Sequence, residues 1–163
     1  MANFGWRVGL FDADIYGASI PAIFNIENQG ITLNDNDEMM PVEKHGVKIN
    51  SMAFITDDCE ALVWRGPMIS KTLTQLLKNT NWGDLDYLII DTPPGTGDIH
   101  LTLLENYKID GYLLISTNHI TSIINTKKTQ EMFEKFHIHK CNFIINMTHI
   151  DEQESIQLFK KNK

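Results

Sequence analysis

The sequence predicts an α/β protein with a doubly wound, mainly parallel sheet, helices on both faces and a small β-hairpin. The first observation is the segment 85–90, a mostly apolar run without clear alternation, which is typical of a parallel strand buried on both faces. The second is a similar run at 6–11, which also ends on an aspartate. The third is the alternation of strand-like and helix-like segments along the remaining chain, which indicates a parallel sheet with helical connections.

The elements of the N-terminal half follow the strand at 6–11. Residues Asn25–Glu38 are rich in turn-forming polar residues and predict a surface loop. Pro41–Lys44 and Val47–Phe54 predict a hairpin that turns at 45–46. Pro67 suits the first turn of a helix. The apolar positions of that helix fall on one face: Ile69, Leu73, Leu76 and Leu77.

In the C-terminal half, Asp98 is placed to cap a short helix, and His100 is expected on the surface of that helix. Strands are predicted at 111–116 and 141–146, with a helix between them, and residues 151–154 resemble a capping box that opens a last helix. The helix between the strands is expected to bury an apolar stripe formed by Ile120, Ile123, Ile124, Met132, Phe133 and Phe136.

Composition bounds the class of protein. The 163 residues suit one domain, 1–163, and 42% hydrophobic residues suffice for a sizeable core. A net charge of −7 argues against nucleic acid or an anionic membrane as the main partner. The sequence contains no apolar run of transmembrane length and no signal-peptide pattern at its start, so we expect a cytoplasmic protein.

The cysteines and histidines predict no metal centre. Cys59 and Cys141 lie far apart without metal-ligand spacing, and both are expected as reduced thiols. His137 and His139 are spaced as neighbours on one face of a strand, but no acidic or thiol ligand accompanies them in that interpretation.

Acidic residues follow two of the predicted strands directly. Ligands of open α/β sheets bind at the carboxyl ends of the strands, and Asp91 lies at such an end. Gly95 allows the backbone to approach a phosphate closely. Asp12 and Asp14, at alternate positions past the first strand, can orient a Mg²⁺-bound water and an attacking water. The alternatives are an ordinary turn after a core strand and solvated loop acids.

Three blocks, 12–17, 64–68 and 91–98, closely resemble the Mrp/ApbC family in the order in which that family carries them. Members of this family are P-loop ATPases of the MinD/ParA-like group that act as iron–sulfur cluster carriers. The resemblance extends from about Ala2 to Met147. One departure is Ala18, where the family usually has proline.

The resemblance implies roles for individual residues. Asp91 would hold Mg²⁺ through a water molecule, and Gly95 would donate its N–H to the γ-phosphate of ATP. Asp14 would orient the attacking water, and Asp12 would support the metal shell. Asn146 matches the position that reads the adenine ring; a local bond from its amide to the backbone is the alternative, of nearly equal weight.

Arg65, in the second block, has two interpretations. It could contact a phosphate or carboxylate across a subunit interface, or it could position the helix that follows. The sequence favours the second.

Two features of the family are missing from these residues. No Gly-x-x-x-x-Gly-Lys-Ser/Thr motif occurs, and Met1–Gly5 looks like the end of the helix that follows the P-loop. No Cys-x-x-Cys pair follows Met147, so ligands for a bridging cluster are absent. The resemblance therefore implies the central part of the enzyme, truncated at both ends.

Three functions remain open. The first is an ATPase that works as a homodimer and passes an iron–sulfur cluster to apoproteins. The second is a MinD/ParA-like positioning ATPase, but the basic amphipathic C-terminal helix this requires is only weakly present at 156–163. The third is a remnant of a disrupted reading frame without activity of its own.

Overall fold

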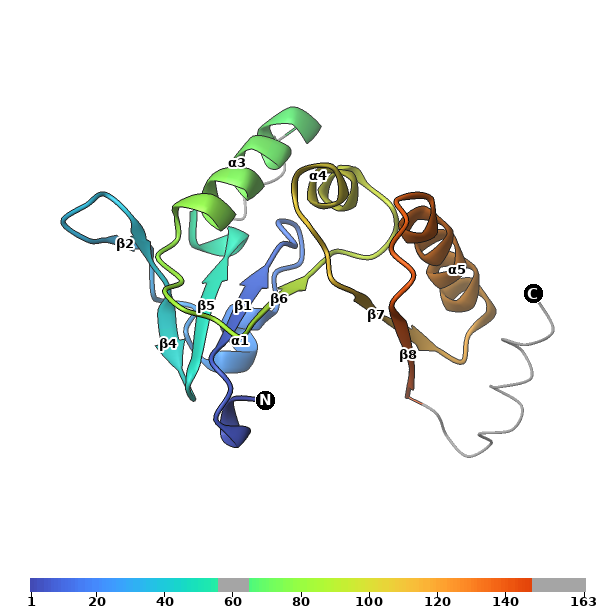
Figure 1. The fold of residues 1–163 in the computed structure, drawn as a ribbon, viewed down its shortest axis with the longest axis horizontal. Helices are drawn as coiled ribbons and strands as arrows, with labels where there is room; N and C mark the ends of the chain where they lie inside the picture. The colour runs from blue at the N-terminus through green and yellow to red at the C-terminus, as the bar shows by residue number, and fades with distance from the viewer. Residues whose placement is uncertain (56–64, 148–163) are drawn as a thin grey trace. The chain divides into compact units, whose positions relative to one another are not determined.

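The computed structural model describes residues 1–55 and 65–147 (Figure 1). The chain divides into two compact units, Met1–Pro93 and Pro94–Lys163. No helix among the described residues is long and apolar enough to cross a membrane.

The first unit is built on a four-stranded sheet, which confirms the mainly parallel α/β prediction. Its strand order is β4-β5-β1-β6. Strand β1 (Val8–Asp12) pairs in parallel with β5 (Val47–Ser51) on one side and with β6 (Tyr87–Asp91) on the other.

The predicted hairpin is also confirmed. Strand β4 (Val42–Lys44) pairs antiparallel with β5, and the two turn residues, His45 and Gly46, have φ values of 53° and 72°. Two positive φ values are typical of the tight turns whose twist matches that of the flanking strands. Because β5 pairs with β1 as well, the hairpin extends the main sheet rather than forming a separate insertion.

Helices lie against both faces of this sheet. On one face, Ile20 of α1 (Ile20–Phe24) packs with Ile26 and with Ile49 of β5. Helix α3 (Gly66–Asn79) lies on the opposite face. Asn50, which follows Ile49 in β5 and so points to that face, donates a 2.7 Å hydrogen bond to the hydroxyl of Thr80, directly after α3. Helix α3 buries the four predicted residues Ile69, Leu73, Leu76 and Leu77. This doubly wound arrangement leaves the carboxyl edge of the sheet for polar groups.

The segment 25–38 departs in part from the predicted loop. Two short strands, β2 (Thr32–Leu33) and β3 (Met39–Met40), pair antiparallel around a polar turn. The Asn34 side chain closes this turn, because its oxygen accepts the backbone N–H groups of Asn36 and Glu38, both at 2.9 Å. The described residues also form two 3₁₀ helices, η1 (Ala2–Phe4) and η2 (Met52–Ile55).

Strand β6 is more exposed than its apolar sequence predicts. Tyr87, Leu88 and Ile89 are 43%, 40% and 42% exposed, so the prediction of burial on both faces is wrong. The reason is its position: β6 is the last strand of the sheet, and among the described residues it pairs only with β1. An edge strand with unpaired backbone groups and apolar residues on both faces favours pairing with another chain.

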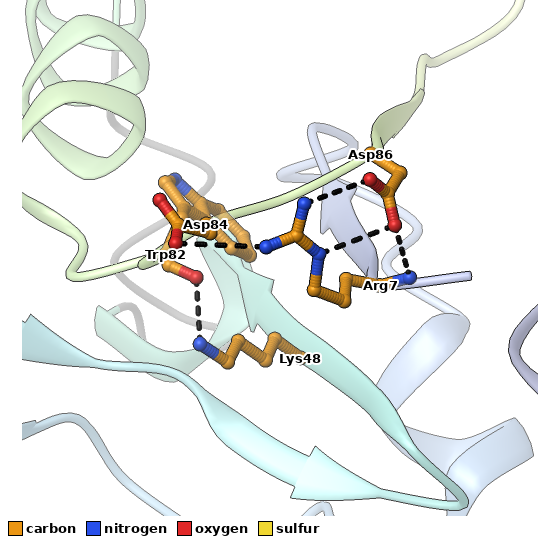
Figure 2. Close-up of polar contacts among 5 residues, drawn as sticks. All are labelled: Arg7, Lys48, Trp82, Asp84 and Asp86. Carbon is orange, nitrogen blue, oxygen red and sulfur yellow. Dashed lines mark hydrogen bonds and ion pairs between the residues drawn. The ribbon is translucent and has the colours of Figure 1, made fainter. Parts of the chain in front are cut away.

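The amino ends of β1 and β6 are joined by a charged cluster (Figure 2). The Arg7 guanidinium donates to both carboxylate oxygens of Asp86, at 3.2 and 2.8 Å, and its backbone N–H donates to the same carboxylate at 2.9 Å. Asp84 lies 3.5 Å from the guanidinium, and Lys48 donates to the Trp82 carbonyl at 2.7 Å. This cluster fixes where β6 begins relative to β1.

Within residues 94–147, the second unit contains one parallel strand pair. Strands β7 (Tyr112–Thr117) and β8 (Cys141–Asn146) pair in parallel, and α5 (Ile120–Lys135) connects them. Tyr112 stacks on Phe133 of α5 with ring centroids 4.2 Å apart. The unit begins with the loop at 94–97 and α4 (Asp98–Asn106).

Three predictions for this unit need correction. The N-cap of α4 is Gly97, and Asp98 is the first helical residue, so Asp98 does not cap the helix. His100 is 3% exposed rather than on the surface; burial lowers its pKa. In α5 only Ile123 of the six predicted residues is buried, while Ile120 and Ile124 are 52% and 47% exposed.

Some predictions fall outside the described residues. These are the side chains of Cys59 and Trp64, the predicted capping box at 151–154 and the last helix.

Replacing Asp86 should destabilise the first unit in a pH-dependent way. Hydrogen bonds and charge from Arg7 lower the Asp86 pKa from 3.8 to about 2. Ionised Asp86 therefore stabilises the fold above pH 4, and this contribution disappears as the pH falls from about 4 towards 2. Asp86→Asn should lower the melting temperature at pH 7, and thermal unfolding followed by circular dichroism should show the difference shrinking in that window. A difference that persists undiminished at pH 2 would contradict this origin.

The exposed edge of β6 should cause self-association. Ile89→Lys places a charge in the middle of this edge and should convert associated chains to monomer, as measured by sedimentation velocity at micromolar concentration. Ile23→Lys, at a 67% exposed position on α1, is the matched control and should leave association unchanged. A wild-type chain that remains monomeric would show that the edge is closed in another way.

Candidate functional site

The carboxyl edge of the first unit brings two of the predicted acids together. The parallel register of β1 and β6 sets Asp12 opposite Asp91, and the Ala13 N–H donates to the Asp91 carbonyl at 2.8 Å. Asp14 follows two residues after Asp12. The structure therefore sets Asp12 beside Asp91 at the carboxyl ends of two adjacent strands, and Asp14 is close enough to influence Asp91 electrostatically. The sequence predicted acids at these two strand ends, and the roles of the three residues stay predictions.

Asp12 is a buried carboxylate held by protein donors. It is 1% exposed; its Oδ1 accepts from the Asp14 N–H at 3.2 Å, and its Oδ2 accepts from the Ile20 N–H and the Ser51 hydroxyl, both at 3.3 Å. Burial raises the pKa of Asp12, and these hydrogen bonds lower it again in part. Because both oxygens have protein partners, Asp12 is suited to shaping the loop after β1.

Asp14 organises the next turn of this loop. Its Oδ1 accepts the backbone N–H groups of Tyr16 and Gly17, both at 3.0 Å. A Cβ at Gly17 would lie 3.2 Å from the other carboxylate oxygen of Asp14, so glycine allows the close approach. These bonds fix the direction of the Asp14 side chain, and directional control is what orienting a water molecule requires.

Asp91 is the exposed member of the group. Partial burial raises its pKa, and the negative charge of Asp14 raises it further. Two carboxylates that repel one another at an open strand end fit a divalent cation, which removes the repulsion. Mg²⁺ prefers oxygen ligands and retains several waters, so one or two carboxylates are enough. Within 1–55 and 65–147, no group of three or more acidic, histidine or cysteine side chains is arranged to hold a metal.

The other predicted site residues belong to the second unit. Gly95 has a φ of 98°, and no atom lies within 4 Å of a Cβ built on it, so the loop needs glycine and is open on that side. Asn146 ends β8, and its side-chain oxygen accepts the Met147 N–H at 2.9 Å. This is the bond to the local backbone that the sequence offered as one interpretation of Asn146. Recognition of the adenine ring by Asn146 stays a prediction.

Arg65 precedes α3 directly. Its carbonyl accepts the N–H groups of Met68 and Ile69 at 2.9 and 3.1 Å, and its extended backbone marks the start of the helix. Any residue at this position could make these backbone bonds, and the Arg65 side chain makes no capping hydrogen bond, so the two interpretations of Arg65 stay predictions.

Sequence reasoning missed two contacts of the site. Ser51 donates to Asp12, and its place at the carboxyl end of β5, beside β1, is the signal that could have identified it. The Thr129 hydroxyl of α5 donates to the Gly95 carbonyl at 3.2 Å, and nothing in the spacing of these two residues predicts that contact.

Comparison with known proteins gives one family. The ParA family model described as NUBPL iron-transfer P-loop NTPase matches residues 1–163. The iron–sulfur cluster carrier protein of Escherichia coli (strain K12) is 45% identical over 148 residues, which cover 91% of this chain and 40% of the relative. That of Aquifex aeolicus is 36% identical over 167 residues, covering 100% of this chain and 46% of the relative. The chain thus spans less than half the length of these two relatives.

Solved structures agree on the fold. The nucleotide-binding protein of Archaeoglobus fulgidus, solved in complex with ADP, superposes with a TM-score of 0.78 at 29% identity over 99% of this chain and 67% of that chain. MinD of Aquifex aeolicus superposes with a TM-score of 0.59 at 15% identity, over 98% and 67% of the two chains. The likeness to MinD shows the fold alone.

Removing the Asp14 charge should lower the Asp91 pKa. The expected change is partial in Asp14→Asn, because burial is the larger cause of the raised value. An Asp91 pKa that is raised in the folded state lowers the free energy of unfolding as the pH rises through that pKa. Asp14→Asn should therefore lose less stability over this pH range than the wild type. A ¹³C titration of the Asp91 carboxyl measures the shift. Asp84→Asn, at the other end of the sheet, is the control, and an Asp91 pKa unchanged in Asp14→Asn would contradict the coupling.

Proposed function

The chain belongs to the ParA family of NUBPL iron-transfer P-loop NTPases, as its resemblance to the Mrp/ApbC proteins predicted, and we propose that it supplies the acidic side of the nucleotide site in an iron–sulfur cluster carrier ATPase. The observation that carries the proposal is the pairing of Asp12 with Asp91 at the ends of β1 and β6, with Asp14 beside them. The two relatives are named iron–sulfur cluster carrier proteins, which supports an iron–sulfur cluster as the group that the whole protein carries.

Each acid has its own part in this proposal. Asp91, exposed at the strand end, would hold Mg²⁺, which would supply positive charge beside the phosphates of ATP. Asp14, fixed by its bonds to Tyr16 and Gly17, orients the water that attacks the γ-phosphate and accepts its proton. Asp12 keeps the loop in place through Ile20 and Ser51. Hydrolysis then yields ADP and inorganic phosphate.

The phosphate cradle of the site lies outside these residues. A P-loop supplies backbone N–H groups and a lysine to the phosphates, and the 163 residues contain no such motif. The proposal therefore assigns to this chain the metal and water side alone. Homodimer formation, delivery of a cluster to apoproteins and a cytoplasmic location are parts of the proposal for the whole protein.

The positioning ATPase has less support. The chain is 15% identical to MinD, and a likeness at that level shows the fold but not the function. The two relatives at 36% and 45% identity are named as cluster carriers. No observation favours it over the carrier.

A chain of these 163 residues should not bind ATP–Mg²⁺ saturably at micromolar concentration, because the acids supply only one side of the phosphates. Calorimetry measures this. Fusion of an N-terminal segment that carries a P-loop should restore binding and hydrolysis. In the fusion, Asp14→Asn should slow hydrolysis by about 100-fold or more, as expected for loss of a catalytic base.

Asp84→Asn is the matched control, since Asp84 is exposed at the opposite end of the sheet. Micromolar binding by the unfused chain, abolished by Asp91→Ala, would reveal a cradle within these residues. A fusion that folds but neither binds nor hydrolyses ATP would count against the proposed function and favour the remnant without activity.

Anaerobic reconstitution with iron and sulfide should leave this chain without the visible absorption of a [4Fe–4S] centre. The reason is that Cys59 and Cys141 belong to separate segments, and a bridging cluster needs closely spaced thiolates. A stoichiometric cluster that disappears in Cys59→Ser or Cys141→Ser would instead show that these thiols are ligands.

A further inference from the structure

The glycine loop before α4 is tied to α5 through one peptide group. The carbonyl of Gly95 accepts a 3.2 Å hydrogen bond from the Thr129 hydroxyl. Gly95 adopts a φ of 98°, which side chains disfavour, so the loop takes a conformation that only glycine readily allows. The contact joins a loop residue to a helix 34 positions further along the chain.

This contact also fixes a donor. The chain has no cis peptide bond among the described residues, and in a trans peptide the N–H points opposite to the C=O of the same plane. The plane that carries the Gly95 carbonyl also carries the Thr96 N–H. Since the carbonyl points to Thr129, the Thr96 N–H points away from α5.

The surroundings leave this N–H available. Thr96 is exposed, and no partner for its N–H occurs among the hydrogen bonds of the described residues. No atom lies within 4 Å of a Cβ built on Gly95, so the adjacent space is open. An unpartnered amide beside open space is suited to donate to an anionic oxygen.

Thr129 has a second acceptor for the same hydrogen. Its hydroxyl lies 3.1 Å from the Asn125 carbonyl of its own helix, the usual partner of a helical threonine. A hydroxyl has one hydrogen to donate. Thr129 can therefore release Gly95 and keep a hydrogen bond within α5, so that movement of the loop leaves no donor unsatisfied.

We propose that Thr129 is a positioning residue that holds the Gly95–Thr96 peptide with the Thr96 N–H aimed at an anionic ligand, and that releases it by turning to Asn125. The identity of the anion as the terminal phosphate of a nucleotide rests on the proposed function. The donor is then the Thr96 N–H, whereas the sequence predicted the Gly95 N–H.

The test uses nucleotide-free protein and NMR. In wild type and Thr129→Ser, which keeps the hydroxyl, the Thr96 amide should have an order parameter near 0.85, typical of a rigid backbone. In Thr129→Val it should fall below about 0.6, the range of flexible backbone, and the Gly95 carbonyl ¹³C resonance should move upfield. Thr129→Ala, a smaller residue without the hydroxyl, should give the same loss.

Thr126→Val is the matched control, because Thr126 donates to the Ser122 carbonyl within the same helix and the change should leave Thr96 unaffected. Millimolar inorganic phosphate should shift the Thr96 amide proton in wild type and less in Thr129→Val. An unchanged order parameter in folded Thr129→Val, a larger phosphate shift at Gly95 than at Thr96, or no shift at Thr96 would overturn the proposal. Since no nucleotide is added, these results are independent of whether the chain binds ATP.

Discussion

The parallel register between β1 and β6 is the constraint on which the site depends. It is set at the amino end by the bidentate contact of Arg7 with Asp86 and continues along the strands to the pair Asp12 and Asp91. A shift by one residue would turn each side chain of β6 to the other face. The exposed ion pair contributes little as a charge interaction. Its importance is that it specifies where the register begins, five positions before Asp12 on one strand and five before Asp91 on the other.

The acids themselves oppose stability and are tolerated because of their partners. Burial of the Asp12 carboxylate disfavours its charge, and three hydrogen bonds compensate for part of that cost. Asp91 remains exposed and electrostatically strained by Asp14. A bound cation would remove this repulsion. The repulsion between Asp14 and Asp91 therefore destabilises the fold without a ligand and favours binding of the cation.

The sequence predicted correctly those features that depend on residues close together in the chain, and failed for those that depend on contacts between distant segments. The hairpin at 45–46, the apolar face of α3 and the acids at the strand ends follow from short-range patterns, and these predictions are confirmed. Burial of β6 and exposure of His100 were predicted wrongly, because burial depends on which elements lie alongside. The contact of Thr129 with Gly95 joins distant segments, and no periodicity encodes it.

The most direct test of this account is to locate a divalent cation on the sheet. Mn²⁺, a paramagnetic substitute for Mg²⁺, should broaden the amide resonances of Ala13, Asp14 and Asp91 at the carboxyl edge. The amides of Asp84 and Asp86, at the amino edge, should stay sharp at the same concentration. This distribution would place the cation where the β1–β6 register gathers the acids. Broadening centred on Asp84 and Asp86, or spread evenly over all the surface acids, would contradict the account.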